Sequence, residues 1–285
     1  MSVFRSLQRI IVTGALLINA SVTSYAYSDS GDTILRSFPL PDALPAPLRS
    51  ETPVPIRREY TVTQVMHHIT SVTGIDVSHY QGNINWADVA GDPNVRFVYI
   101  KATEGAGLKD SYLQRNVQGA RQAGLPAGLY HFFSPTAPVR EQLSNFLGTA
   151  KRCQQDLIPI VDVEKRGRQS AELFHRRLHD FLSSVEQFYG VKPIIYTYMN
   201  FYNRYMAGKY SQYKFMIASY SEDVPELIDE PQMVLWQFTA EGSVEGVHTH
   251  VDRSRFMDRY SLPDILLPRC PRHYDISVEN IYHFR

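Results

Sequence analysis

The stretch LIPIVDVE, residues 157–164, decides the fold prediction because it reads as a buried strand that ends in two acids. Side chains alternate along a strand, so Asp162 and Glu164 should face the same side, with Cα atoms roughly 6.5–7 Å apart. Like charges at this separation raise one pKa, so that one group stays protonated while its neighbour is ionised. Cleavage of a glycosidic bond needs such a pair. A strand end whose acids meet arginines or water would show the same pattern.

Strand-like and helix-like segments alternate on both sides of this stretch. About eight β units with intervening helices, spread over some 185 residues, predict an α/β fold, a shortened or irregular TIM-like (β/α) barrel. The span is short for such a barrel, so we expect some helices to be missing or reduced to loops. The predicted strands are 74–78, 96–102, 127–133, 157–164, 192–198, 214–219, 233–238 and a weak eighth at 246–251, and the predicted helices are 85–89, 109–123, 139–154 and 169–189.

Polar residues recur where these strands end. In barrels of this kind the chemistry is located at the carboxyl ends of the strands. Their recurrence at successive strand ends favours a catalytic role for the acid pair over the alternative of a solvated strand end. The residues are Asp76, Ser78, Lys101 to Glu104, Tyr130, His131, Asp162, Glu164, Tyr196, Trp236, Gln237 and Asp252.

The N-terminal residues suggest an exported protein. Residues 1–26 read as a signal peptide, with Arg5 and Arg9 before an apolar run and a small-residue cleavage site ending at Ala26. An uncleaved anchor is the alternative, but the apolar run is shorter than the roughly 20 residues that span a bilayer. We therefore expect a periplasmic or extracellular protein without a stable membrane span. Residues 27–71 read as a Pro/Ser-rich linker, and the tail 258–285 carries no functional signal.

Charge and cysteine content narrow the function classes. The 285 residues have a formal net charge of zero, which gives no indication of a nucleic-acid partner. No Cys/His cluster suggests zinc, so we expect neither a metal nor a cofactor, and we expect a monomer. The sequence leaves open whether its two cysteines, Cys153 and Cys270, pair after export or remain thiols.

Five motifs together resemble the family-25 glycoside hydrolases. These enzymes are muramidases that cut the β-1,4 bond between N-acetylmuramic acid and N-acetylglucosamine. The resemblance covers roughly residues 72–257, and the motifs follow the family's order, which makes the set specific. They are GIDVSHYQG (74–82), FVYIKATEG (97–105), GLYHF (128–132), PIVDVE (159–164) and LWQF (235–238).

The resemblance implies a role for each acid. Glu164 corresponds to the general acid, Asp162 to its partner carboxylate, and Asp76 and Asp252 to two further acids that line the pocket. It also implies peptidoglycan glycan strands as substrate, with attack by the substrate's own N-acetyl oxygen; strand spacing alone does not choose among inverting, covalent and assisted routes. The sequence departs from the family after Asp252, where the family more often has Val-Asp-x-Asn. Tyr130 and Trp236 match aromatic positions around the sugar, and Tyr196, Gln237 and Glu104 complete the predicted substrate-binding set.

Two other functions compete with this interpretation. A non-catalytic wall-binding module on the same fold would be expected to lack the acids, but all four are present. A metal-dependent deacetylase would use histidines with Asp76, but the spacing of His67, His68, His79 and His131 matches no metal motif. A Ser78/His79 dyad is disfavoured because adjacent strand positions face opposite sides.

Overall fold

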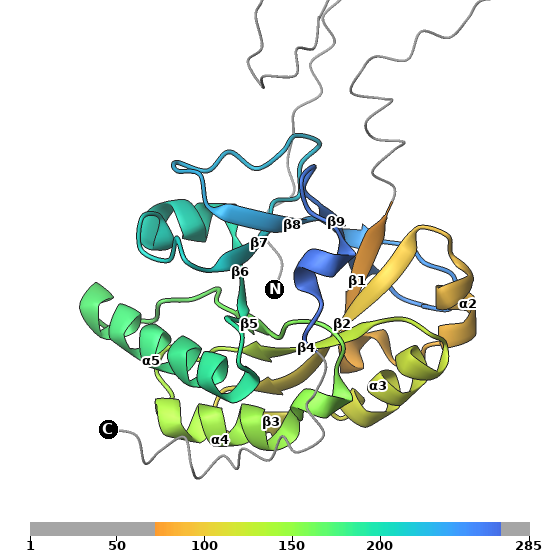
Figure 1. The fold of residues 1–285 in the computed structure, drawn as a ribbon, viewed down its shortest axis with the longest axis horizontal. Helices are drawn as coiled ribbons and strands as arrows, with labels where there is room; N and C mark the ends of the chain where they lie inside the picture. Colours follow the sequence, from red (N-terminus) through yellow and green to blue (C-terminus); the bar gives the residue numbers. More distant parts are fainter. Residues whose placement is uncertain (1–71, 269–285) are drawn as a thin grey trace, which may run out of the picture. The chain divides into compact units, whose positions relative to one another are not determined.

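Hydrogen bonding between the first two long strands closes the sheet into a barrel (Figure 1). The computed structural model describes residues 72–268. Around the ring the order is β1-β2-β4-β5-β6-β7-β8-β9, while β3 (Leu108–Lys109) pairs only with the end of β2. The predicted irregular TIM-like barrel is therefore confirmed. The ring strands are β1 Thr73–Val77, β2 Val95–Glu104, β4 Ala127–Phe132, β5 Ile160–Asp162, β6 Ile194–Tyr198, β7 Lys214–Ala218, β8 Gln232–Gly242 and β9 Val251–Phe256.

Helices surround only part of this ring, which accounts for its short chain. The first four parallel crossovers each contain an α-helix of six or more residues: α2 (Trp86–Gly91), α3 (Leu113–Gln122), α4 (Val139–Thr149) and α5 (Ala171–Tyr189). After β6 the helices shrink to a single turn followed by a π-helical turn, and no helix separates β7, β8 and β9. The short elements are η1 His79–Gln81, η2 Arg152–Gln154, α6 Met199–Phe201, η3 Tyr202–Met206 and η4 Leu262–Ile265.

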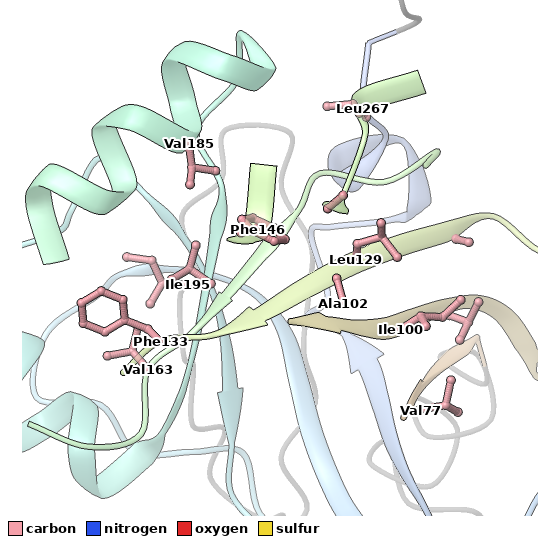
Figure 2. Packing of buried hydrophobic residues seen from close by; sticks show 14 of the residues in the cluster. Val77, Ile100, Ala102, Leu129, Phe133, Phe146, Val163, Val185, Ile195 and Leu267 are labelled. Atoms are coloured by element: carbon pink, nitrogen blue, oxygen red, sulfur yellow. The ribbon is translucent and has the colours of Figure 1, made fainter. Parts of the chain in front are cut away.

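Two apolar layers hold the barrel together. One lies between the strands and the helices, where Phe146 of α4 and Val185 of α5 point toward strand residues such as Leu129 and Ile195 (Figure 2). The buried positions of α5 recur every three or four residues, as expected for a helix with one face on a sheet. The second layer fills the barrel interior, and its members include Phe97, Tyr99, Ile160, Ile194, Met216, Leu235 and Phe256.

Local sequence signals set the ends of the main helices. The side chains of Asn85 and Ser170 accept hydrogen bonds from backbone N–H groups in the first turns of α2 and α5. Gly190 ends α5 in the left-handed conformation at φ +69°, which a residue with a Cβ adopts only at a cost. Helix α3 begins at Leu113 and not at residue 109, because Leu108–Lys109 pair with β2.

The predicted eighth strand was wrong in position. The strand is β9, Val251–Phe256, and it runs antiparallel to both β8 and β1. Residues 246–250 belong to the loop between β8 and β9, in which Gly246 has a φ of +88°. Only Val251, Ser254 and Phe256 of β9 are buried, so its remaining polar residues concealed the strand pattern. The predicted fourth strand was also too long, because β5 ends at Asp162 and Glu164 lies just beyond it.

The folded domain extends past residue 257, where the sequence placed its end. Ile265 is completely buried, its carbonyl accepts a hydrogen bond from Ile158 N (2.8 Å), and Leu267 N donates to Asp156 O (2.8 Å). The segment 258–268 therefore packs against the chain that leads into β5. The predicted signal peptide (1–26) and linker (27–71), together with 269–285 of the tail, lie outside the described residues.

Cys153, in η2, is disulfide-bonded. The one other cysteine of the sequence, Cys270, lies outside the described residues. Among residues 72–268 no helix has both the length and the apolar character that crossing a bilayer requires.

We expect Ile265→Ala to lower the free energy of unfolding by about 2–5 kcal/mol, the usual effect of truncating a fully buried aliphatic side chain. The matched control is Leu266→Ala, one residue along, because Leu266 is 43% exposed and should lose less than about 1 kcal/mol. Urea unfolding of both variants measures the difference. Equal losses would contradict the placement of 258–268 in the folded domain.

Candidate active site

Four acids from distant parts of the chain line one cavity of about 400 Å³ at the carboxyl ends of the parallel strands. Asp76 comes from β1, Asp162 from the end of β5, Glu164 from the residues after it, and Asp252 from the start of β9. Because β9 is antiparallel, its beginning lies at the edge where the other strands end. The remaining lining residues are Lys101, Tyr130, Phe132, Ile160, Tyr196, Tyr198, Met216, Tyr220, Gln237 and Ala240.

Asp76 and Asp252 lie directly opposite each other on neighbouring strands. The Asp76 carboxylate accepts hydrogen bonds from Gln237 Nε2 (3.0 Å) and Ser254 Oγ (3.3 Å). Burial and, to a smaller extent, the charge of Asp252 raise the pKa of Asp76 to about 7, while the two hydrogen bonds oppose this shift. Burial also raises the pKa of Asp252 to about 6. This side of the cavity therefore gains protons just below neutral pH.

Asp162 and Glu164 form the second pair. Asp162 is 7% exposed, and its Oδ1 is buried without a hydrogen-bond partner in the described part of the chain. Burial, and then the charge of Glu164, raise the pKa of Asp162 well above its ordinary value, while Lys101 opposes the shift. Burial likewise raises the pKa of Glu164, against the effects of Lys165 and of a hydrogen bond with Tyr198. The pair therefore favours a state that keeps a proton.

Three tyrosines, Tyr196, Tyr198 and Tyr220, line the same cavity as these acids and are here called the aromatic wall. Gln237 holds two of them in place. The side-chain oxygen of Gln237 accepts hydrogen bonds from the hydroxyls of Tyr196 and Tyr220, both at 2.9 Å, while its nitrogen donates to Asp76. The ring of Tyr198 packs edge-on against Tyr196 and Tyr220, with centroids 6.0 and 6.3 Å away. Tyr198 and Tyr220 are 36% and 51% exposed, so their rings offer apolar surfaces with polar edges, which suit a sugar ring.

Lys101 is the basic residue of the cavity lining. It is 8% exposed, its Nζ donates to Glu104 Oε2 at 2.7 Å, and it lies 5.4 Å from the ring centroid of Phe132. Its charge lowers the pKa of both Asp162 and Glu164, although less than burial raises each. Lys101 thus limits how far the pKa values of Asp162 and Glu164 rise above their ordinary values.

Residues 75–247 match the model of the family "Glycosyl hydrolases family 25". The chain belongs to this family. The Escherichia coli (strain K12) protein named "Uncharacterized protein YegX" is 39% identical over 190 residues, covering 65% of this chain and 70% of that protein. "Lysozyme M1" of Streptomyces globisporus is 30% identical over 201 residues, covering 66% and 68%. The crystal structure of the bacterial lysozyme from Streptomyces coelicolor superposes with a TM-score of 0.60 at 30% identity, covering 68% of this chain and 94% of that one.

Most of the predicted site residues of this family-25 hydrolase meet in the cavity. All four predicted acids line it. Three of the five predicted substrate-binding residues do so as well, namely Tyr130, Tyr196 and Gln237.

Trp236 and Glu104 lie outside the lining, contrary to the sequence prediction. Trp236 precedes Gln237 on β8 and so faces the opposite side of the sheet. Its ring is 1% exposed beneath the guanidinium of Arg255, 4.1 Å away, and its Nε1 donates to Ser219 O. Glu104 is linked to the cavity by the hydrogen bond that it accepts from Lys101 Nζ, and its charge raises the pKa of Asp162. Trp236 supports the wall from behind and does not present its ring to the cavity.

The histidines considered for a deacetylase are engaged away from the four acids. His79 Nδ1 lies 2.7 Å from Asp110 Oδ2. His131 is fully buried with Nδ1 2.7 Å from Thr103 Oγ1, and burial lowers its pKa to about 3. Residues 72–268 contain no group of three or more side chains arranged to hold a metal ion, while His67 and His68 lie outside the described residues. The imagined histidine–Asp76 centre is therefore not formed by His79 or His131.

Sequence reasoning missed Tyr198 and Tyr220. Each lies two residues after an inward-facing residue: Tyr198 follows Tyr196, which lines the cavity, and Tyr220 follows Ala218, which packs in the barrel interior. Extending the strand alternation past the last residue of β7 would have placed Tyr220 on the cavity side.

We expect Asp76→Asn to stabilise the protein increasingly as the pH rises. The folded-state pKa of Asp76, about 7, exceeds its ordinary value of 3.8, so the wild-type free energy of unfolding falls between about pH 4 and pH 7. Asn keeps an acceptor for Gln237 but cannot ionise. Urea unfolding should show a gain at pH 8 of up to about 4 kcal/mol, because one pKa unit corresponds to about 1.4 kcal/mol.

The same gain should be small at pH 4, where Asp76 is protonated in the folded protein. Asp223→Asn is the matched control, because Asp223 is exposed in the loop between β7 and β8 and should show no pH-dependent gain. A gain for Asp76→Asn that is equal at both pH values would contradict the raised pKa.

Proposed function

We propose that the protein is an exported N-acetylmuramidase, a lysozyme that cleaves the β-1,4 bond between N-acetylmuramic acid and N-acetylglucosamine in peptidoglycan. The observation that carries the proposal is the meeting of four carboxyl groups with raised pKa values in one cavity of a family-25 hydrolase. Glycosidic cleavage needs a proton donor beside groups that stabilise positive charge. The signal-like pattern of residues 1–26 supports export to the periplasm or the exterior.

Glu164 is the proposed general acid. It is half-buried at the edge of the cavity, where a leaving-group oxygen can approach, and burial raises its pKa. It donates its proton to the glycosidic oxygen as the bond from that oxygen to the anomeric carbon breaks. The departing sugar leaves as an alcohol, and Glu164 remains as a carboxylate that can activate water in the next step.

Asp162 is proposed to assist through the substrate's acetamido group. The acetamido oxygen attacks the anomeric carbon and forms a cyclic oxazolinium, whose positive charge and N–H face Asp162. The Oδ1 of Asp162 is a buried acceptor that meets no donor within residues 72–268, and this supports the assignment. A hydrogen bond to the ionised form of Asp162 lowers its pKa, so substrate binding moves the proton of the pair to Glu164.

The second step regenerates the enzyme. Water attacks the anomeric carbon, Glu164 accepts its proton, and the oxazolinium reopens to the acetamido group, with net retention of configuration. Asp76 and Asp252 contribute negative charge near the positively charged transition state. Their titration at about 7 and about 6 makes this contribution strongest above neutral pH.

Glu164→Gln should reduce the rate of peptidoglycan clearing at least about a hundredfold, the usual contribution of a general acid, while leaving the fold intact. Glu222→Gln is the matched control, since Glu222 is exposed in the loop after β7. Mass spectrometry of wild-type digests should show muramic acid at the new reducing ends. Glucosamine at those ends, or near wild-type clearing by a folded Glu164→Gln protein, would refute the assignment.

Removal of the N-acetyl group from the muramic residues should block cleavage, because the internal nucleophile is then absent. The comparison is digestion of matched acetylated and N-deacetylated peptidoglycan, with intact mass spectrometry of trapped enzyme alongside. Equal rates on both substrates, or a glycosyl adduct on Asp162, would show instead that the carboxylate itself attacks.

A further inference from the structure

A group of four cations, here called the basic rim, adjoins Glu164. Three of its members, Lys165, Arg166 and Arg168, lie in the loop that leads from β5 to α5, immediately after the proposed acid. The fourth, Arg204, belongs to the π-helical turn after β6, the strand that pairs with β5. Lys165, Arg168 and Arg204 are exposed, and Arg166 is partly buried.

Ion pairs within residues 72–268 do not occupy the basic rim, although the charge of Lys165 acts on the neighbouring Glu164. None of the ion pairs found there includes these four side chains. Three of the four lie over aromatic rings: Arg166 and Arg204 lie 5.4 and 5.2 Å from the ring centroid of Tyr205, and Lys165 lies 5.6 Å from that of Phe132. Two guanidinium groups on one ring repel each other, so an anion placed between or above them would be favoured.

The loop that carries three of these cations is held in a fixed shape. The Gln169 side chain donates to Pro135 O (2.8 Å) and Arg166 O (3.2 Å) and accepts from Arg177 Nη1 (3.0 Å). Gly167 adopts φ +73° where it lies against Pro135. A loop backbone that is already held in place need not be ordered when a ligand binds, so only the exposed side chains of Lys165 and Arg168 lose conformational freedom.

The proposed substrate carries anions close to the glycosidic bond that is cleaved. If Glu164 protonates the oxygen leaving the muramic residue, the lactyl ether on that same sugar projects from the cavity within one ring of Glu164. In peptidoglycan this lactyl group is amide-linked to a short peptide whose residues bear free carboxylates. A guanidinium or ammonium group pairs with a carboxylate by a charge-assisted hydrogen bond.

We propose that the basic rim binds the carboxylates of the peptide attached to the muramic residue being cut. The proposal rests on the muramidase function above and specifies its substrate further: glycan with acidic peptides is preferred over the same glycan with neutral ones. The aromatic wall holds the sugars, and the basic rim reads the charge of their peptide substituents.

The test compares soluble glycan chains with free peptide carboxylates and the same chains after blocking the amines and coupling the carboxylates to ammonia. The wild type should cleave the acidic chains with a KM about three- to tenfold lower, from two or three exposed ion pairs. Arg168→Gln/Arg204→Gln should lose this preference through KM on the acidic chains, with kcat and the rates on amidated chains unchanged. Lys165 and Arg166 are left intact because Lys165 acts on Glu164 and Arg166 braces the loop.

The matched control is Arg96→Gln/Lys151→Gln, which removes two exposed charges near the opposite ends of the strands and should keep the wild-type preference. No wild-type preference, or an equal loss with the control variant, would overturn the proposal. Calorimetry of both chain types with Glu164→Gln tests the basic rim separately from the muramidase function, because it measures binding without cleavage. If the wild type cleaves neither chain type but Glu164→Gln binds the acidic chains more tightly, only the muramidase function is refuted. If Glu164→Gln binds both chain types equally, the role of the basic rim is refuted.

Discussion

Removing four carboxyl groups from water within one barrel mouth is the constraint on which this structure depends. Each group loses hydration, which favours its protonated form, and the charge of a neighbouring acid raises the pKa of three of them further, namely Asp76, Asp162 and Glu164. The two apolar layers of the barrel supply the stability that permits this arrangement. Functional sites commonly reduce stability in this way, because the chemistry needs groups that packing alone would exclude.

The four acids differ in the hydrogen bonds that their carboxyl groups receive, and this difference distinguishes their roles. Asp76 accepts hydrogen bonds from Gln237 and Ser254, whereas one buried oxygen of Asp162 has no hydrogen-bond partner in the part of the chain that the structure describes. A satisfied acid is held in one orientation before substrate arrives. An unsatisfied acid gains a hydrogen bond only when substrate supplies the donor, so part of the binding free energy is directed to the reacting group.

The sequence predicted the barrel and the four acids because both depend on local patterns. Apolar runs that end in polar residues identify parallel strands and the edge where they finish, and this reasoning placed Asp76, Asp162 and Glu164 correctly. It misplaced the last strand, because four of the six residues of β9 are polar and the strand runs antiparallel to its neighbours. It misjudged Trp236 because an aromatic residue beside Gln237 suits either face of β8, and only the register with β7 and β9 fixes which one. The basic rim and the hydrogen bonds of Gln237 join segments that no local pattern relates.

The antiparallel direction of β9 also determines where the ends of the domain emerge. The chain enters β1 at Val72 on the side away from the cavity, and after β9 it returns to that side, where Pro268 O accepts a hydrogen bond from Arg152. A parallel crossover from β8 to the last strand would have delivered the end of the chain to the cavity mouth. With both connections on the far side, the domain can be tethered at either end, or at both, while its mouth stays open to a polymer much longer than itself.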